Sequence, residues 1–337
     1  MTMKTPINVA LVGFGFSGST FHAPFLSALD DYNLCSVVSS NSEKVKASLP
    51  NVHVESDFTR ILKDPALDLI VIATPNTTHY ELAKAALESG KHVVVDKPFT
   101  VHSKEAEALI QIAKDHGRIL TVYHNRRWDG DFLTIKKLLS EKVLGDVYLY
   151  EAHFHRFRPH PNPQRWKESE FVGSGILYDL GSHLIDQALH LFGPPDAFDA
   201  DIITQRPGAV ADDYFHLNLR YGTKRVILKA SNLVSNPGPR YQLHGTKGSF
   251  LKNGIDPQEQ DLILGKNPFD KTWGQDKEQN YGLLSVGNQH TPIPTLPGDY
   301  GSFYKSVAKA IYDKSPPPVL AEEAYQVMLL LEKCRRK

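Results

Sequence analysis

The feature that most restricts the fold of this chain is the alternation of short apolar runs and helical patterns in its first third. The two clearest helical patterns, residues 79–89 and 103–116, are each followed by a glycine, a residue that often ends helices. Continuous apolar strands are buried on both faces, so the alternation predicts a parallel sheet covered by helices on both sides. The apolar runs that we expect to form strands are residues 9–12, 34–39, 69–73, 92–95 and 119–122.

The pattern changes after about residue 123. Residues 147–157 alternate as a half-buried strand does, residues 176–191 form a helical pattern, and residues 252–300 are rich in Gly, Pro, Asn and Asp. We therefore predict two domains, residues 1–123 and residues 124–337. The second is expected to be α+β with a mostly antiparallel sheet, and its final helix, 322–333, could pack back on the first domain. Its other expected strands are 198–203, 215–219, 225–233 and 241–245.

Length and charge exclude several classes of protein. With 337 residues, two domains of ~150 residues are expected. Lys+Arg and Asp+Glu are both 38, so no basic excess predicts nucleic-acid binding. No apolar run approaches the ~18 residues of a membrane helix, and the N-terminus leads into a strand pattern rather than a signal peptide. Two distant cysteines, Cys35 and Cys334, form no disulfide framework, so we expect a cytoplasmic protein.

A glycine motif directly follows the first predicted strand. Gly13, Gly15 and Gly18 form G-x-G-x-x-G, which lets backbone N–H groups approach a pyrophosphate near a helix N-terminus. We expect Gly13, Gly15 and Phe16 at a dinucleotide; the alternative is a glycine-rich turn with no ligand. Because Pro24 would fall inside a helix that began at Ser17, we expect the helix to begin later.

The residues after the second strand bear on the choice of cofactor. An acidic residue that binds the ribose of NAD is expected at this strand end, but the chain has Ser39 and Ser40 there, followed by Asn41 and Lys44. Hydroxyl groups and a cation suit the 2′-phosphate of NADP, which a carboxylate would repel. We therefore predict NADP, with Ser39, Ser40 and Lys44 as contacts. The alternative is a polar loop in which Glu43 serves NAD.

Two further motifs carry candidate catalytic groups. Lys97 follows the fourth apolar run, so it should lie at the carboxyl edge of the sheet, where ligands bind; Pro98 makes a cis bond possible. Asp179, His183 and Asp186 are spaced i, i+4 and i+7, so they should share one helix face. A histidine beside a carboxylate is an acid–base pair suited to neutral pH. The alternatives are a surface lysine and an ordinary Asp–His contact.

These motifs together resemble the Gfo/Idh/MocA oxidoreductases, and the resemblance covers essentially the whole chain. The motifs that match in order are the glycine loop, Asp-Lys-Pro at 96–98 and D-x-G-x-H-x-x-D at 179–186. The segments 124–129 and 165–166 resemble a subgroup that includes NADP-dependent scyllo-inositol dehydrogenase. The chain departs from the commoner family pattern at Asp96, where Glu is usual, and at Ser174, where many members have Gly.

The resemblance implies a Rossmann domain followed by a domain whose open sheet forms oligomer contacts, in a homodimer or homotetramer. It places Lys97, Asp179 and His183 around the nicotinamide, with His183 as the general base in oxidation. Lys97 would stabilise alkoxide character on the reacting oxygen, and Asp179 would hold a substrate hydroxyl or orient His183. Further cofactor contacts are expected at Thr74, Pro75, Asn76, His79, Arg165 and Trp166.

Three further residues are candidates for substrate contact. His155 should lie on a strand that forms the second domain's side of the cleft. Asn125 and Arg127 follow the sixth strand; the alternative for these two residues is an interdomain hydrogen-bond cluster. Trp166 either stacks near the cofactor or packs against residues 159–163. His153, His155 and His160 do not complete a recognisable metal-ligand set, so we expect no metal.

The sequence thus predicts an NADP-dependent oxidoreductase acting on a secondary alcohol or ketone of a cyclic polyol or sugar. Its expected partners are that small substrate and copies of itself, without nucleic acid or membrane. Two alternatives stay open. One is an NAD-dependent glycosidase that oxidises transiently, and the other is a sugar- or nucleotide-sensing relative without catalysis.

Overall fold

The computed structural model describes residues 5–336, which form two compact units. The first unit contains the described residues up to Asn125 together with 258–271 and 300–325, and the second contains 126–257, 272–299 and the remainder of the C-terminus. The units are therefore not the two continuous ranges that the sequence suggested. Aromatic packing explains the difference, because Phe269 lies 6.1 Å and Tyr304 also 6.1 Å from Phe25, measured between ring centroids.

The first unit is built on a parallel sheet of six strands in the order β3-β2-β1-β4-β5-β6. The five predicted strands are present, and β3 is an addition. Order reversal between β1 and β4 creates the crevice at which dinucleotides bind in such sheets. The strands are β1 (Ile7–Val12), β2 (Tyr32–Val38), β3 (His53–Glu55), β4 (Leu69–Ile72), β5 (His92–Val95) and β6 (Leu120–Val122).

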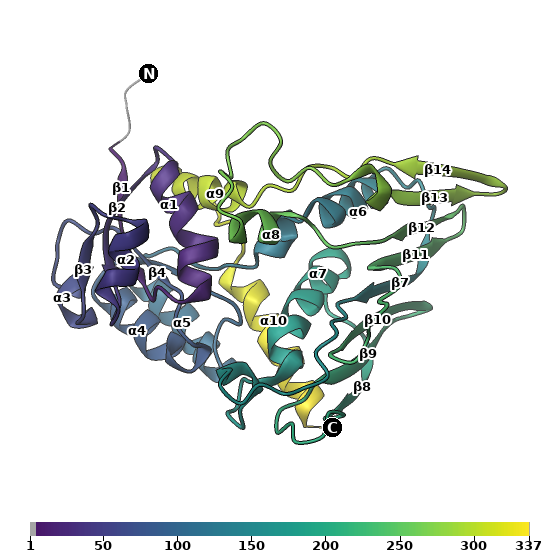
Figure 1. Cartoon of the computed structure of the whole chain (residues 1–337), viewed down its shortest axis with the longest axis horizontal. Helices are drawn as coiled ribbons and strands as arrows, with labels where there is room; N and C mark the ends of the chain where they lie inside the picture. Colours follow the sequence, from purple (N-terminus) through teal and green to yellow (C-terminus); the bar gives the residue numbers. More distant parts are fainter. Residues whose placement is uncertain (1–4, 337) are drawn as a thin grey trace. The chain divides into compact units, whose positions relative to one another are not determined.

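Helices flank this sheet (Figure 1). The predicted helices α4 (His79–Glu88) and α5 (Ser103–Asp115) end within a residue of their expected bounds, next to glycines with positive φ angles. The C-terminal helix α10 (Ala321–Arg335) has residues in both units. The other helices of the first unit are α1 (Ala23–Ala28), α2 (Ser42–Ser48), α3 (Phe58–Leu62), α8 (Gln258–Ile263) and α9 (Gly301–Asp313).

The helix after the glycine motif begins earlier than expected. Helical backbone starts at Phe16, continues as a π-helical turn over Gly18–His22, and becomes α1 at Ala23. Pro24 stands in the first turn of α1, where a missing N–H is tolerated. The expectation of a later start was wrong because the wider turn, and not a longer loop, accommodates the proline.

The second unit is built on a mixed sheet of eight strands in the order β14-β13-β12-β11-β7-β10-β9-β8, antiparallel except for the β7–β10 pair. This confirms the predicted mostly antiparallel α+β architecture. The stretch 252–300, for which the sequence favoured no element, supplies the β13–β14 hairpin. The strands are β7 (Val147–His153), β8 (Ala197–Ile203), β9 (Tyr214–Tyr221), β10 (Lys224–Ser231), β11 (Tyr241–Gly245), β12 (Ser249–Lys252), β13 (Gly282–Val286) and β14 (Gln289–Ile293).

Helix α7 (Ser182–Phe192) covers one face of this sheet, next to α6 (Gly130–Ser140) (Figure 1). The Tyr150 ring lies 5.4 Å from Phe192, and the Tyr241 hydroxyl donates to the Gln187 side chain at 2.8 Å. Glu151 and His153 alternate with these buried residues and project from the opposite face. Within the described residues, no helix has the length and apolar character needed to span a membrane.

Candidate active site

The glycine motif lies at the carboxyl end of β1, and each glycine has a different role. Gly13 has a φ of +94°, and a Cβ there would lie 2.7 Å from the Ala73 carbonyl oxygen. A Cβ on Gly18 would lie 2.0 Å from the Gly13 carbonyl oxygen, whereas a Cβ on Gly15 would meet no atom within 4 Å. Gly13 and Gly18 are thus needed by the loop itself. Gly15 leaves open space beside exposed backbone, which fits the pyrophosphate of a dinucleotide.

The loop after β2 presents polar side chains to solvent. The Asn41 N–H donates to the Ser39 hydroxyl oxygen at 3.1 Å, and the Asn41 side chain caps α2 by accepting from the Lys44 N–H at 2.9 Å. The side chains of Ser40 and Lys44 are exposed. Glu43 stands in the first turn of α2 and not at the strand end. This edge therefore offers hydroxyl and ammonium groups where a 2′-phosphate would be bound.

The segment after β4 is ordered by His79. The His79 side chain is buried, with Nδ1 2.9 Å from the Pro98 carbonyl oxygen and Nε2 3.0 Å from that of Thr74. Burial lowers the pKa of His79, and the neighbouring Asp96 opposes that shift. His79 ties the loop after β4 to the loop after β5, because both ring nitrogens face backbone carbonyls. Its predicted role as a cofactor contact stays a prediction.

The same segment contains the other residues predicted to contact the cofactor. The Thr74 and Thr78 hydroxyls are 2.7 Å apart, and Pro75 precedes a short 3₁₀ turn, Asn76–Thr78. Asn76 is buried within the turn. Phe16, predicted from the glycine motif, is 58% exposed at the start of its helix.

Lys97 follows β5 at the carboxyl edge of the same sheet, as predicted, and the Lys97–Pro98 peptide bond is cis. The neighbouring Asp96 carboxylate accepts from the Lys97 backbone N–H at 2.7 Å and from the Ser17 hydroxyl of the glycine-loop helix. Burial alone would raise the pKa of Asp96, but interactions with His22, Ser17 and Lys97 hold it well below its usual range. The sheet therefore brings the glycine loop and Lys97 together through one carboxylate.

In the second unit, Asp179 and His183 are carried by a helix with an irregular start. Asp179 lies in a π-helical turn, Leu177–Gly181, and His183 lies in the first turn of α7 with its side chain buried. The Asp179 carboxylate accepts from Lys167 Nζ at 2.6 Å and from Arg156 Nη1 at 3.1 Å. The sequence missed both cations, since neither lies at a helical spacing from Asp179.

Arg127, which the sequence predicts at the substrate, forms an ion pair with Asp186. Its Nε and Nη2 donate to the two carboxylate oxygens of Asp186 at 2.9 and 2.6 Å. Both side chains are buried within the second unit. The pair therefore fixes α7, and the predicted substrate contact of Arg127 stays a prediction. Asn125, the last residue of its segment in the first unit, is also buried.

His155 also differs from its predicted position. Phe154 points to the covered face of the sheet, whereas the rings of His153 and His155 lie 5.4 Å apart on the other face. Burial, with the charges of His153, Lys229 and Arg240, lowers the pKa of His155 to about 4. Because α7 covers the Phe154 face, His155 lies on the opposite side of the sheet from His183, and the reason for placing it at the substrate no longer holds.

Arg165 and Trp166 lie in an exposed segment of the second unit. Trp166 begins a 3₁₀ turn that ends at Glu168, and its ring is 36% exposed with the Lys167 ammonium 5.7 Å from the ring centroid. Arg165 is exposed. Among the described residues, no cluster of three metal-ligating side chains was found.

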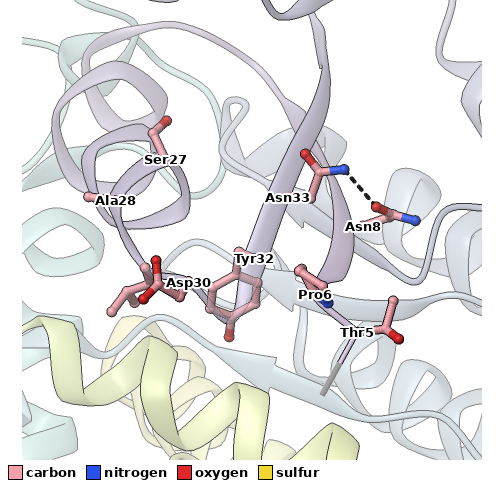
Figure 2. A pocket seen from close by; sticks show the side chains of 9 residues that line it. Thr5, Pro6, Asn8, Ser27, Ala28, Asp30, Tyr32 and Asn33 are labelled. Atoms are coloured by element: carbon pink, nitrogen blue, oxygen red, sulfur yellow. Dashed lines mark hydrogen bonds between the residues drawn. The ribbon is translucent and has the colours of Figure 1, made fainter. Parts of the chain in front are cut away.

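A surface pocket of about 440 Å³ lies at the opposite end of the parallel sheet (Figure 2). Thr5, Pro6 and Tyr32 line it near the amino ends of β1 and β2, and its Asn33 and Asn8 amides hydrogen-bond to each other at 2.9 Å. Such sheets bind dinucleotides at their carboxyl ends. The pocket is therefore not the dinucleotide site.

The parallel sheet, its glycine loop and Lys97 define the class of NAD(P)-binding oxidoreductases. Comparison with known proteins gives the family. The description "Oxidoreductase family, NAD-binding Rossmann fold" matches residues 7–124, and "Oxidoreductase family, C-terminal alpha/beta domain" matches residues 136–337. The chain belongs to the Gfo/Idh/MocA oxidoreductase family.

Relatives in sequence and structure support the same conclusion. The chain is 44% identical to the Bacillus subtilis scyllo-inositol 2-dehydrogenase (NADP(+)) IolW, over 97% of this chain and 92% of that protein. It is 46% identical to the Escherichia coli oxidoreductase YdgJ, over 98% and 96% of the two chains. The solved structure of the Bacillus subtilis oxidoreductase yvaA is similar with a TM-score of 0.96 and 43% identity, over 99% and 97%. The chain is thus a dehydrogenase or reductase of this family.

Proposed function

We propose that the chain transfers a hydride between NADP, in preference to NAD, and a secondary alcohol or ketone of a cyclic polyol such as an inositol, or of a sugar. The observation that carries the proposal is the presence of Lys97 at the carboxyl edge of the nucleotide-binding sheet in a chain that also has Asp179 and His183. A sensing relative has no need of a general base, and the glycosidase alternative predicts retained cofactor without net reduction.

The roles of the three residues follow from their chemistry. NADP, when bound, would supply the hydride acceptor for the oxidative direction. His183 takes the proton of the reacting hydroxyl, and Lys97 donates a hydrogen bond to the same oxygen. Asp179, held between Lys167 and Arg156, accepts from a second hydroxyl of the substrate. A polyol provides the adjacent hydroxyls that this division of roles requires.

The cofactor preference rests on the loop after β2. Ser39, Ser40 and Lys44 supply donors and a positive charge, and no carboxylate stands at the strand end. Such a loop favours a 2′-phosphate over a free ribose hydroxyl. The name of the 44% identical relative IolW specifies NADP(+) and scyllo-inositol, which supports both the cofactor and the substrate class. Contacts from Phe16, Thr74, Pro75, Asn76, Arg165 and Trp166 are part of the same proposal.

The uncovered face of the eight-stranded sheet supports a homo-oligomer, as a dimer or tetramer. It carries mixed polar and apolar side chains such as Leu149, Glu151 and Ile227. The wholly balanced charge and the two cysteines support action in the cytoplasm on small substrates, without nucleic acid or membrane. The oligomer is checked by light scattering of the purified chain.

The test of the function is reduction of NADP, with NAD in parallel, across a panel of inositols, sugars and sugar alcohols. Turnover with NADP and an inositol or aldose is expected. In Lys44→Ala the KM for NADP should rise about 10-fold while that for NAD stays unchanged, since one charge-assisted contact contributes about 1.5 kcal/mol. Turnover with NAD alone would remove the cofactor preference. Tight NADPH binding without any turnover would favour the glycosidase or sensing alternatives.

A further inference from the structure

Three buried polar side chains of the first unit, those of Tyr304, His22 and Asp96, form a row that ends at Lys97. His22, at the end of the π-helical turn, is fully buried; its Nδ1 lies 2.5 Å from the Tyr304 hydroxyl of α9, and its Nε2 lies 3.8 Å from Asp96 Oδ2. Asp96 accepts from the Lys97 backbone N–H at 2.7 Å. The row therefore connects a C-terminal helix to the lysine after β5.

The proton positions in this row follow from burial. Burial raises the pKa of the Tyr304 hydroxyl well above its ordinary value, so the hydroxyl keeps its proton and can donate it to His22 Nδ1. An imidazole ring that accepts a hydrogen bond at Nδ1 carries its proton on Nε2. Nε2 makes no hydrogen bond among the described residues, and the acceptor it faces is the Asp96 carboxylate.

Neighbouring rings and one further hydrogen bond hold the row in place. The Tyr123 ring lies 4.4 Å from the His22 ring, and the Phe25 ring stacks on Tyr304. The Tyr32 hydroxyl donates to the Tyr304 carbonyl oxygen at 2.5 Å. The Tyr32 hydroxyl thus supports α9 through a backbone carbonyl and does not bond to His22. Tyr32 is therefore a matched control for Tyr304.

Asp96 is the point at which this row reaches the candidate active site. It contacts the glycine-loop helix through Ser17 and the backbone of Lys97. A charged carboxylate beside a lysine favours the protonated ammonium. A protonated Lys97 is the form that can donate a hydrogen bond to the reacting oxygen.

We propose that His22 and Tyr304 are positioning residues for Lys97 and that they act through the Asp96 carboxylate. The Tyr304 hydroxyl selects the His22 tautomer whose proton faces Asp96, and Asp96 fixes the start of the Lys97 side chain and its charge. The inference rests on the proposed function, since it assigns a purpose to Lys97. It extends that function to α9, far along the chain from the motifs that identify the family.

The first test is a double-mutant cycle on hydride transfer. Tyr304→Phe removes one hydroxyl and keeps the ring; kcat is expected to fall about 10-fold with KM unchanged, less than the roughly 100-fold of a 1 Å misplacement. Asp96→Asn should lower kcat further and move the alkaline limb of the kcat/KM profile to lower pH, because Lys97 loses its carboxylate. If Tyr304 acts through Asp96, Tyr304→Phe has no additional effect in the Asp96→Asn background.

The matched control is Tyr32→Phe, which removes a buried tyrosine hydroxyl from the same cluster. Its kcat and pH profile should stay at wild-type values, although its thermal stability falls as that of Tyr304→Phe does. Equal losses of kcat in the two variants, or losses that multiply in the double mutant, would overturn the proposal and leave a structural role only.

The second test does not depend on turnover. Histidine ¹⁵N NMR of the whole protein, with the His22 signals assigned by His22→Gln, should show the Nε2–H tautomer in wild type and a change of tautomer in Tyr304→Phe. An unchanged tautomer overturns the inference even if the enzyme is active. Absence of turnover in wild type with the expected NMR result would count against the proposed function and not against the row itself.

Discussion

Two carboxylates next to candidate catalytic groups are held in opposite ways. Asp96 in the first unit is buried and accepts from a backbone N–H and a serine hydroxyl, and His22 Nε2 lies 3.8 Å from its Oδ2. Asp179 in the second unit keeps 15% of its side chain exposed and is held by Lys167 and Arg156, themselves 45% and 23% exposed. Buried donors cannot be replaced by water, whereas partly exposed ion pairs can exchange partners.

This contrast indicates a division of labour. A carboxylate with buried donors is suited to hold one group in one place, and Asp96 accepts from the Lys97 backbone N–H. A carboxylate between two partly exposed cations is suited to receive a ligand hydroxyl, because such ion pairs can exchange partners.

The largest expected effect separates the lysines beside the two carboxylates. Lys97→Met should lower turnover by at least about 1000-fold, since it removes a donor to the developing alkoxide. Lys167→Met should lower turnover by no more than about 10-fold, because Arg156 still holds Asp179. Steady-state kinetics measures both, with NADPH fluorescence titration as the control for binding. Equal losses would mean that the two lysines have the same role.

The carboxylates should differ in stability as well. Asp96→Asn is expected to lower the free energy of unfolding by about 2 kcal/mol, within the range for buried hydrogen bonds to a charged group. Asp179→Asn should cost less than about 1 kcal/mol, as partly exposed ion pairs do. Urea denaturation of the two variants gives both values, and a larger cost at Asp179 would reverse the comparison.

The pH dependence of the Asp96 contribution has a definite sign. The pKa of Asp96 in the folded chain lies below its usual range, and the unfolded value is about 3.9. Asp96 therefore stabilises the fold fully above the unfolded pKa, and the contribution is lost as the pH falls through the folded pKa. The stability gap between wild type and Asp96→Asn should be constant from about pH 5 to 8 and should shrink below about pH 4. A gap that narrows between pH 6 and 8 would point to another group.

Salt should produce the smallest effect. The exposed pairs of Asp179 are screened at high ionic strength, where the Debye length falls to about 3 Å at 1 M. The stability difference between wild type and Asp179→Asn should therefore fall toward zero between 0.05 and 1 M NaCl, roughly as screening predicts. That of Asp96→Asn should change little. Thermal unfolding at the two salt concentrations tests this, and a salt-sensitive Asp96 would show that solvent reaches its site.

Local patterns were sufficient for the fold class and the family. Buried strands such as β4 are continuous apolar runs, and helices such as α5 end at a glycine, so their bounds follow from burial and backbone freedom alone. The glycine motif and Lys97 also lie at strand ends, where a parallel sheet places ligand contacts whatever the rest of the chain does. These positions depend on residues close in sequence.

What each side chain touches was decided by the tertiary structure. Arg127 pairs with Asp186, His79 bridges two backbone loops, and Tyr304 reaches His22 across more than 280 positions of sequence. Periodicity assigned His155 to a strand but not to a face of the sheet relative to α7. Sequence periodicity predicts which residues of a segment are buried, because burial is a property of each residue by itself. A hydrogen bond needs two residues, and only the folded chain brings distant partners together.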